Sequence, residues 1–159
     1  MKNLKKIVTL LLVLATVFCF IACTNNNPTG DLTPTSTIEA NTGIKKEGLW
    51  ATALYTEDTI LGEGSKTLNV IVKVEEQSVT FTIKTDKKTV GEALLEHSLI
   101  AGEEGAYGLY VKSVNGIKAD YDTDKAYWGF FQNGEYMMTG VDTTNFESGQ
   151  SYELVYTKG

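Results

Sequence analysis

The sequence predicts an α+β domain in which one helix packs on one face of a mixed sheet. Two strand-like segments with alternating apolar residues come first, a single capped helix follows, and about four further strand-like segments lie after it. A hairpin, then a helix, then more strands is typical of an α+β layout, because the helix must bury its apolar stripe against the sheet.

The first two strands are predicted from a period of two. Apolar residues occupy every second position of 68–74 and of 79–83, and the polar residues 75–78 separate the two segments. Successive side chains of a strand point to opposite faces, so this alternation predicts a hairpin with one buried face.

A helix is predicted to begin at Val90. Thr89 and Glu92 match the capping box, in which each side chain accepts a hydrogen bond from the backbone of the other residue. The helix should continue to about Leu99, and the glycine-containing stretch 102–108 should end it. Its sheet-facing residues are expected to be Val90, Ala93 and Leu94.

The remaining strands are predicted from turn signals. Asn115-Gly116 and Asn133-Gly134 are both strong signals for two-residue hairpin turns. The last strand should be 151–157, where Tyr152, Leu154 and Tyr156 share a face. Among known arrangements, this layout is most like a β-grasp.

The amino terminus has the layout of a bacterial secretory signal. Three lysines precede the apolar run 7–21, and the small residue Ala22 stands directly before Cys23. The run is shorter than the ~20 residues that a membrane-spanning helix needs. Residues 20–23, Phe-Ile-Ala-Cys, resemble the bacterial lipobox. We therefore expect residues 1–22 to be a lipoprotein signal peptide. Lipid on Cys23 would hold the protein on the extracytoplasmic face of the cell membrane.

Residues 23–47 are predicted to be a disordered tether, and residues 48–159 a single domain. The tether is rich in Asn, Thr and Pro, so it cannot bury enough apolar surface to offset its ordering entropy. Residues 23–159 keep 11 of the 14 lysines and all 20 acidic residues, a formal charge of −9, and the sequence has no arginine. This charge argues against nucleic acid as a partner, because phosphate recognition depends on clustered Lys and Arg.

Few residues are candidates for metal binding or catalysis. His97, the one histidine of the sequence, lies on the flank of the predicted helix, where a lone histidine is usually structural. Asp120, Asp122 and Asp124 resemble the start of a calcium loop, but the later Gly and Glu of that loop are missing, which favours a solvated turn. No serine stands in a nucleophile context. We expect no metal site, no catalytic residue and no enzymatic activity.

The aromatic residues gather in one part of the chain. Eleven of the 16 lie in residues 107–156, and most are expected in the core. Strand alternation sends Tyr127 and Phe131 to one face and Trp128 and Phe130 to the other. A strand that is apolar on both faces needs a cover on the second face. That cover is either the amino-terminal segment around Leu49-Trp50 or a ligand or partner.

Five short motifs follow one another in the carboxy-terminal half of the sequence. They are Val114-Asn115-Gly116, Tyr127-Trp128, Met137-Met138-Thr139-Gly140-Val141-Asp142, Ser148-Gly149-Gln150 and Tyr152-Glu-Leu-Val-Tyr156. Together they resemble the bacterial domains related to the carboxy-terminal β-domain of transcobalamin and gastric intrinsic factor. The capped helix also stands where that family has one, so the resemblance covers about residues 67–158.

The resemblance implies a ligand site. In the vitamin carriers the β-domain caps a corrinoid that is held against a large helical domain. The candidate ligand-binding residues are therefore Tyr127, Trp128, Phe130, Met137, Met138, Thr139 and Gly140. The folded part of this chain is too short to include the helical domain, so the domain alone would bind weakly or would need a partner protein to complete the site.

We expect a lipid-anchored, non-enzymatic binding module for a corrinoid or another small ligand. The alternative is a cell-surface module for protein interaction or for adhesion to cell-wall glycan, since exposed aromatic side chains stack on sugars and an open sheet edge accepts a partner strand.

Overall fold

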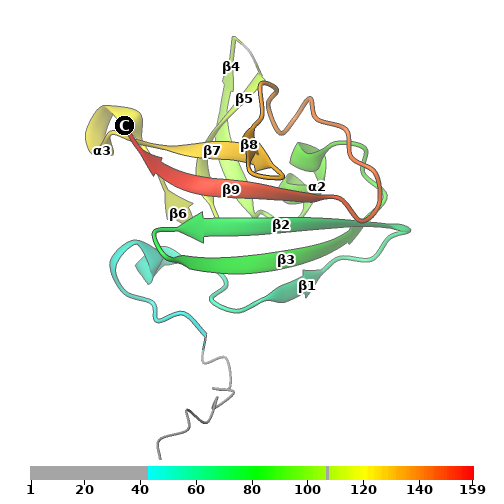
Figure 1. Ribbon diagram of the computed structural model, residues 1–159, viewed down its shortest axis with the longest axis horizontal. Coiled ribbons are helices and arrows are strands. Elements are labelled where there is room, and N and C mark those ends of the chain that lie inside the picture. The colour runs from blue at the N-terminus through cyan, green and yellow to red at the C-terminus, as the bar shows by residue number, and fades with distance from the viewer. Residues whose placement is uncertain (1–42, 107) are drawn as a thin grey trace, which may run out of the picture. The chain divides into compact units, whose positions relative to one another are not determined.

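The computed structural model describes residues 43–106 and 108–159, all of which belong to one compact unit (Figure 1). The predicted signal peptide, Cys23 and the predicted tether as far as residue 42 lie outside these residues. Within the two described ranges, no helix combines the length and the apolar character that crossing a membrane requires.

The described chain forms two sheets and a few short helices, so the predicted α+β class is confirmed. The larger sheet is mixed and has six strands in the order β1-β3-β2-β9-β7-β8. These strands are β1 (Thr59–Leu61), β2 (Lys66–Val74), β3 (Gln77–Thr85), β7 (Ala126–Gln132), β8 (Glu135–Tyr136) and β9 (Ser151–Lys158). The smaller, antiparallel sheet consists of β4 (Ile100–Gly105), β5 (Gly108–Val114) and β6 (Ile117–Lys118). The helical elements are η1 (Gly48–Thr52), α2 (Val90–Glu96) and α3 (Tyr121–Asp124).

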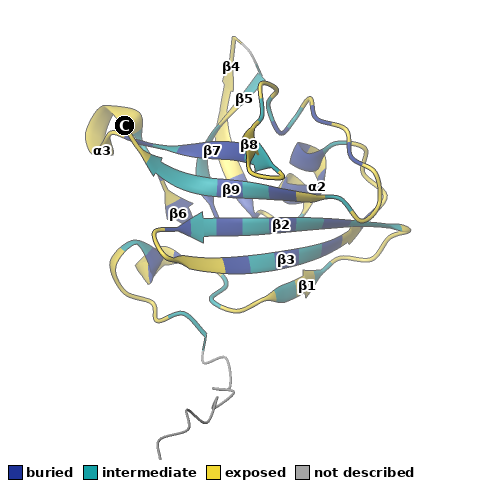
Figure 2. Cartoon of the chain, viewed as in Figure 1, coloured by how far each residue is buried: buried dark blue, intermediate teal, exposed yellow. Residues whose placement is uncertain are grey.

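The predicted first hairpin is confirmed. Strands β2 and β3 pair antiparallel from Lys66↔Thr85 to Val74↔Gln77. Burial alternates along both strands, and the inward residues of β2 and of β3 from Val79 onward are buried (Figure 2). This alternation is the period of two that the sequence shows, and it directs one face of the hairpin into the core.

Helix α2 begins as predicted but ends earlier. The Thr89 side chain accepts from the backbone N–H of Glu92, and the Glu92 side chain accepts from that of Thr89, which completes the capping box. Val90, Ala93 and Leu94 are buried. The helix stops at Glu96 instead of Leu99, because Ser98 has a φ of 54°, which no continuing right-handed helix allows.

The stretch after the helix was wrongly predicted to be only a break. Residues 100–105 form β4, which pairs antiparallel with β5. The pairing shifts between Ala101 and Gly102, where a Cβ on Gly102 would collide with the Tyr110 carbonyl. Strand β4 is exposed beyond Ile100, so it has no apolar alternation for a sequence pattern to detect.

Both predicted Asn-Gly turns are confirmed. Asn115 and Gly116 have φ values of 50° and 78° and connect β5 to β6. Asn133 and Gly134 have values of 52° and 80° and connect β7 to β8. Two successive residues with positive φ form the hairpin turn that matches the twist of the flanking strands.

One continuous core lies behind the larger sheet. Strands β4 and β5 rise behind β7 and β9 and run across their direction, and α2 also lies behind the sheet (Figure 1). Inward residues of β2, β3, β7 and β9 share one cluster with buried residues of α2, β5 and β6. In that cluster, Val70 is opposite Tyr152, and Leu154 lies between Val72 and Phe130.

The segment around Leu49-Trp50 does not cover the outward face of β7. Trp50 is buried next to β6, and the backbone of Tyr55 exchanges two hydrogen bonds with the Asn115 side chain, of 2.9 and 2.7 Å. Tyr127 and Phe131 stay partly exposed. The prediction that the amino-terminal segment around Leu49-Trp50 covers this face is therefore wrong.

Candidate functional site

A pocket of about 370 Å³ opens where the smaller sheet meets β7 and β8. Its walls come from β5, β7, β8, one residue of β9 and the loop that follows β8. Thirteen residues line it: Leu109, Tyr110, Val111, Tyr127, Trp128, Phe130, Tyr136, Met137, Met138, Thr139, Gly140, Val141 and Leu154. None of them carries a charge. The pocket therefore lies at the junction of segments that are distant in the sequence.

The floor of the pocket is fixed by strand pairing. β7 pairs antiparallel with β9, which sets Trp128 opposite Tyr156 and Phe130 opposite Leu154. The Trp128 and Tyr156 rings meet edge to face, with centroids 5.6 Å apart, and Phe130 stacks on Tyr152 at 5.4 Å. Trp128 and Phe130 are each 7% exposed. The floor side chains are therefore packed against the aromatic side chains of β9 in the offset and edge-to-face arrangements that aromatic pairs prefer.

Burial also determines the ionisation of the two tyrosines behind the floor. Desolvation raises the pKa of Tyr152 above its ordinary value of 10.0. It raises the pKa of Tyr156 as well, where the nearby charges of Asp124 and Glu75 act in the same direction. Both hydroxyls are therefore neutral at physiological pH, and neither brings a charge to the floor.

The rim of the pocket is exposed and apolar. Tyr110 is 45% exposed, Tyr136 is 55% exposed and Met138 is 93% exposed. Tyr136 meets the Phe131 ring edge to face, with centroids 5.2 Å apart, which supports it from the outer side of β7. A thioether and two phenol rings left in water are unusual for a surface that meets only solvent.

The loop at residues 137–144 is held in place by backbone contacts. The amide of Gly91 donates to the Val141 carbonyl at 2.7 Å, and the amide of Val90 donates to the Thr144 carbonyl at 2.9 Å. The carbonyl of Gly140 accepts from the Thr144 amide and from its hydroxyl. The loop therefore rests on the amino end of α2, so the capped helix positions one wall of the pocket.

Asp142 connects this loop to the smaller sheet. Its Oδ2 accepts from the backbone N–H of Leu109 at 3.1 Å. A Cβ on Gly140 would lie 2.5 Å from Oδ1, and a Cβ on Gly108 would collide with Oδ2. Glycine at both positions lets the carboxylate lie directly against the backbone of the two pocket walls.

Two buried polar atoms at the site have no hydrogen-bond partner among the described residues. They are the Nε1 donor of Trp128 and the Oδ1 acceptor of Asp142. Burial without a partner is costly for such groups. Two further atoms, Trp50 Nε1 and His97 Nε2, are in the same condition outside the pocket.

The seven residues predicted as ligand contacts all line this one pocket. The structure therefore brings them together, although Tyr127 is on the strand face opposite to Trp128. Sequence reasoning missed six lining residues: Leu109, Tyr110, Val111, Tyr136, Val141 and Leu154. The segment 109–111 was missed because its hairpin partner β4 was not predicted, and only the tertiary fold sets β5 against β7.

The other candidates of the sequence lie outside the pocket. His97 caps the carboxyl end of α2, and its Nε2 is 4.0 Å from the Glu96 carboxylate. Asp120 accepts from the amides of Asp122 and Thr123 and so caps α3. Among the described residues, no group of three or more His, Cys, Asp or Glu is arranged to hold a metal ion.

The fold and the pocket define a small α+β domain with an apolar, partly exposed cavity. The chain matches the crystal structure of a protein from Ruminococcus gnavus ATCC 29149 that is provisionally described as metal binding. The identity is 32%, the TM-score is 0.57, and the match covers 60% of this chain and 99% of that one. The chain therefore belongs to the same family as the R. gnavus protein.

Residues 87–158 match a family described as a domain of unknown function (DUF4430). A second solved structure, haptocorrin in complex with Cbi, matches with 21% identity and a TM-score of 0.45. That match covers 62% of this chain and only 26% of haptocorrin, so the chain spans about a quarter of that protein. The comparison with curated proteins gave no match.

Proposed function

We propose that this chain is a lipid-anchored, non-enzymatic module that binds a small apolar ligand on the outer side of the cell membrane. One observation carries the proposal: the seven residues singled out in the sequence line a single pocket. Its volume of about 370 Å³ falls in the range of known ligand sites. A packed aromatic floor and flexible methionines at the edge suit a small-molecule ligand with a broad apolar face.

The absence of enzymatic activity is part of the proposal. Apart from the Thr139 hydroxyl and the phenol groups of three tyrosines, the described lining offers no acid, base or nucleophile. General acid–base chemistry usually needs His, Asp, Glu or Lys within hydrogen-bond reach of the substrate. The lining supports recognition of a ligand better than its chemical conversion.

A corrinoid is the first ligand to test. It is the ligand that the sequence resemblance implies, and its flat macrocycle offers an apolar edge of the kind that this pocket accommodates. The R. gnavus relative is provisionally described as metal binding. A corrinoid carries its metal in its own ring, so such a ligand needs no cluster of protein donors, and the described residues contain none.

We further propose that a partner protein completes the site. Tyr110, Tyr136 and Met138 leave apolar surface exposed around the opening. A macrocycle seated on this rim would keep its second face in water. A partner that covers this face would bury both the ligand and the rim, which adds affinity in proportion to the apolar area removed from water.

The test is a titration of cobinamide and cobalamin into residues 39–159, a compact unit that contains the whole core. Binding is followed by calorimetry and by tryptophan fluorescence corrected for ligand absorption. Trp50→Phe leaves Trp128 as the one tryptophan, because the sequence has two. We expect saturable binding that quenches Trp128 and that is lost in Trp128→Ala with the circular dichroism spectrum unchanged.

The controls separate the pocket from the rest of the surface. Met138→Ala removes a rim side chain that is 93% exposed, so its effect on binding cannot come from unfolding. Tyr121→Leu changes an exposed tyrosine of α3 outside the pocket and should leave binding unchanged. If neither corrinoid binds at high micromolar concentration, the module alone does not hold a corrinoid. If binding persists in Trp128→Ala, the ligand uses another site.

The adhesion alternative is less well supported. It predicts a broad flat patch, whereas the exposed aromatic side chains Tyr110 and Tyr136 border a concave opening. Retention of the protein on purified cell wall, unaffected by Trp128→Ala, would favour adhesion instead.

The membrane anchor is tested separately. Cys23→Ser should abolish incorporation of labelled fatty acid and release the protein from the membrane fraction. Labelling that persists in this variant would contradict the proposed lipidation site, and fractionation of the unaltered chain with soluble proteins would contradict the proposed location.

A further inference from the structure

The pocket has no group that could neutralise a negatively charged ligand. No lysine is among the thirteen lining residues, and the sequence has no arginine. An anion that entered this apolar space would lose its hydration without gaining an ionic partner, which is strongly unfavourable. The lining therefore disfavours ligands that carry carboxylate or phosphate groups on the buried side.

The aromatic residues of the pocket favour the opposite charge. Five of the lining residues are aromatic: Tyr110, Tyr127, Trp128, Phe130 and Tyr136. Trp128 and Phe130 lie on the inward face of β7, whereas Tyr127 lies on its outward face. Aromatic rings carry negative potential on their faces and attract cations within about 6 Å of the ring centre, and Trp is the most effective. Sites that combine several such rings are a known way of binding organic cations whose surface is otherwise apolar.

A carboxylate lies directly behind one wall. Asp142 Oδ1 is buried, has no hydrogen-bond partner, and would lie 2.5 Å from a Cβ on Gly140, which lines the pocket. Among the described residues, no lysine or histidine forms an ion pair with Asp142. Its one described hydrogen-bond donor is the Leu109 amide, so no opposite charge among the described residues offsets it. A negative charge so close to the pocket attracts a cation.

We infer that the pocket selects an apolar ligand that carries a positive charge. The inference rests on the proposed function, since it names the charge class of the ligand for the same site. Three observations favour a cation: the absence of lysine from the lining, the aromatic lining, and the Asp142 carboxylate, which has no ion pair among the described residues. The formal charge of the whole chain, −6, also attracts a cation as it diffuses toward the protein.

Two matched pairs of probes test the inference on residues 39–159. Choline and 3,3-dimethylbutan-1-ol have the same shape, but only choline is charged. Diaquacobinamide and dicyanocobinamide share one macrocycle, but only the diaqua form is cationic. Binding is measured by calorimetry and by NMR shifts of the Met138 methyl and the Trp128 indole N–H. We expect the cationic member of each pair to bind about three- to tenfold more tightly.

Two variants test whether the preference for a cation arises from Asp142 and from the aromatic rim. Asp142→Asn keeps the size of the side chain and an oxygen that can accept from Leu109, and it should reduce the preference for the cation without weakening the neutral probe. Tyr136→Leu keeps an apolar side chain at an exposed position and should also reduce the preference. Tyr121→Leu, outside the pocket, is the matched control and should leave the ratio unchanged.

The outcomes separate this inference from the proposed function. Equal affinity for both members of each pair would overturn the charge preference and leave a binding module in place. Tighter binding of the neutral members would overturn it as well. If none of the four probes binds, the inference fails together with the corrinoid form of the proposed function. An unchanged ratio in both Asp142→Asn and Tyr136→Leu would show that any preference arises elsewhere.

Discussion

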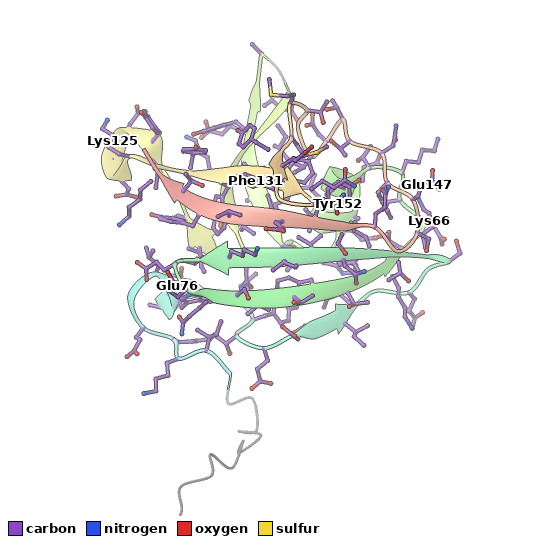
Figure 3. All side chains as sticks on the ribbon, in the orientation of Figure 1. Lys66, Glu76, Lys125, Phe131, Glu147 and Tyr152 are labelled. Carbon is purple, nitrogen blue, oxygen red and sulfur yellow. The ribbon has the colours of Figure 1, made fainter. Side chains whose placement is uncertain are left out.

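Strands β2 and β7 lie on either side of β9 and differ in what their inward side chains contact. The inward residues of β2 are at most 1% exposed, because the core closes over them completely. Those of β7, Trp128 and Phe130, form the floor of a pocket whose rim remains in water. Figure 3 shows the side chains around the two strands, with Phe131 on β7 and Tyr152 on β9 labelled.

The difference shows that alternation alone does not distinguish a core strand from a ligand-binding strand. Both strands direct large apolar residues to the same side of one sheet. The rest of the chain buries the inward side chains of β2 completely, whereas it leaves a cavity beside the inward side chains of β7. A strand whose apolar face exceeds what its own domain covers is a place where another molecule gains by binding.

The largest effect on stability is expected in the well-packed part of the core, at β3. Phe81 on β3 is fully buried and meets the Tyr55 ring edge to face, at 5.5 Å. Phe81→Ala should lower the free energy of unfolding by about 3–5 kcal/mol, because it removes a large ring and leaves a cavity. Chemical denaturation measures this loss. A loss below about 1 kcal/mol would mean that the core around Phe81 is no better packed than the pocket.

The next largest effect on stability is expected where α2 contacts the loop at residues 137–144. A Cβ on Gly91 would lie 2.8 Å from the Asp142 Cα, in the loop behind the pocket. Gly91→Ala should therefore destabilise the domain by about 1–3 kcal/mol, although alanine is the better helix former by about 1 kcal/mol. Leu95→Ala, at an exposed position of the same helix, is the control. A stabilised Gly91→Ala variant would show that the loop is not fixed against α2.

A smaller effect should appear at acidic pH. Hydrogen bonds from the backbone amides of Lys88 and Thr89 hold the pKa of Glu92 below its ordinary value of 4.5. A carboxyl whose pKa is lowered in the folded state stabilises the fold above its ordinary pKa, and this contribution is lost as the pH falls through the folded-state pKa. The melting temperature of Glu92→Gln should therefore be lower than that of the unaltered domain at pH 7. The gap should narrow as the pH falls below 4.5, and a gap that is constant with pH would contradict this origin.

The smallest effect on stability is expected at the rim. Met138 is 93% exposed, so Met138→Ala should change the free energy of unfolding by less than about 0.5 kcal/mol. The same variant should weaken cobinamide binding, because the thioether borders the pocket. Denaturation and calorimetry on one preparation measure both quantities. A large loss of stability would mean that Met138 is packed in the fold and does not form a free rim.

Local chemistry explains why several elements could be predicted. The capping box at Thr89 and the turns at Asn115 and Asn133 depend on residues that are adjacent in the chain. Such signals act through short-range hydrogen bonds and backbone preferences, so they survive in the tertiary structure. The β2–β3 hairpin is similar, since its alternation and its turn lie within one continuous segment.

The elements that were missed depend on contacts between distant segments. Strand β4 contains Gly102, Glu103 and Glu104, and it exists because its backbone pairs with β5. The position of Trp50 next to β6, instead of over Tyr127, likewise depends on hydrogen bonds between Tyr55 and Asn115, 60 residues apart. Pairing across such distances leaves no periodic trace in either segment.

The sequence by itself determined the α+β class, the start of the capped helix, the turns and seven of the thirteen residues that line the pocket. The tertiary structure alone decided that these residues line one cavity, that Leu109–Val111 form its opposite wall, and that the Oδ1 atom of Asp142 is buried behind it without a hydrogen-bond partner. The physical reason is that propensities and turns act over a few residues, whereas a cavity is the space that remains after distant segments have packed.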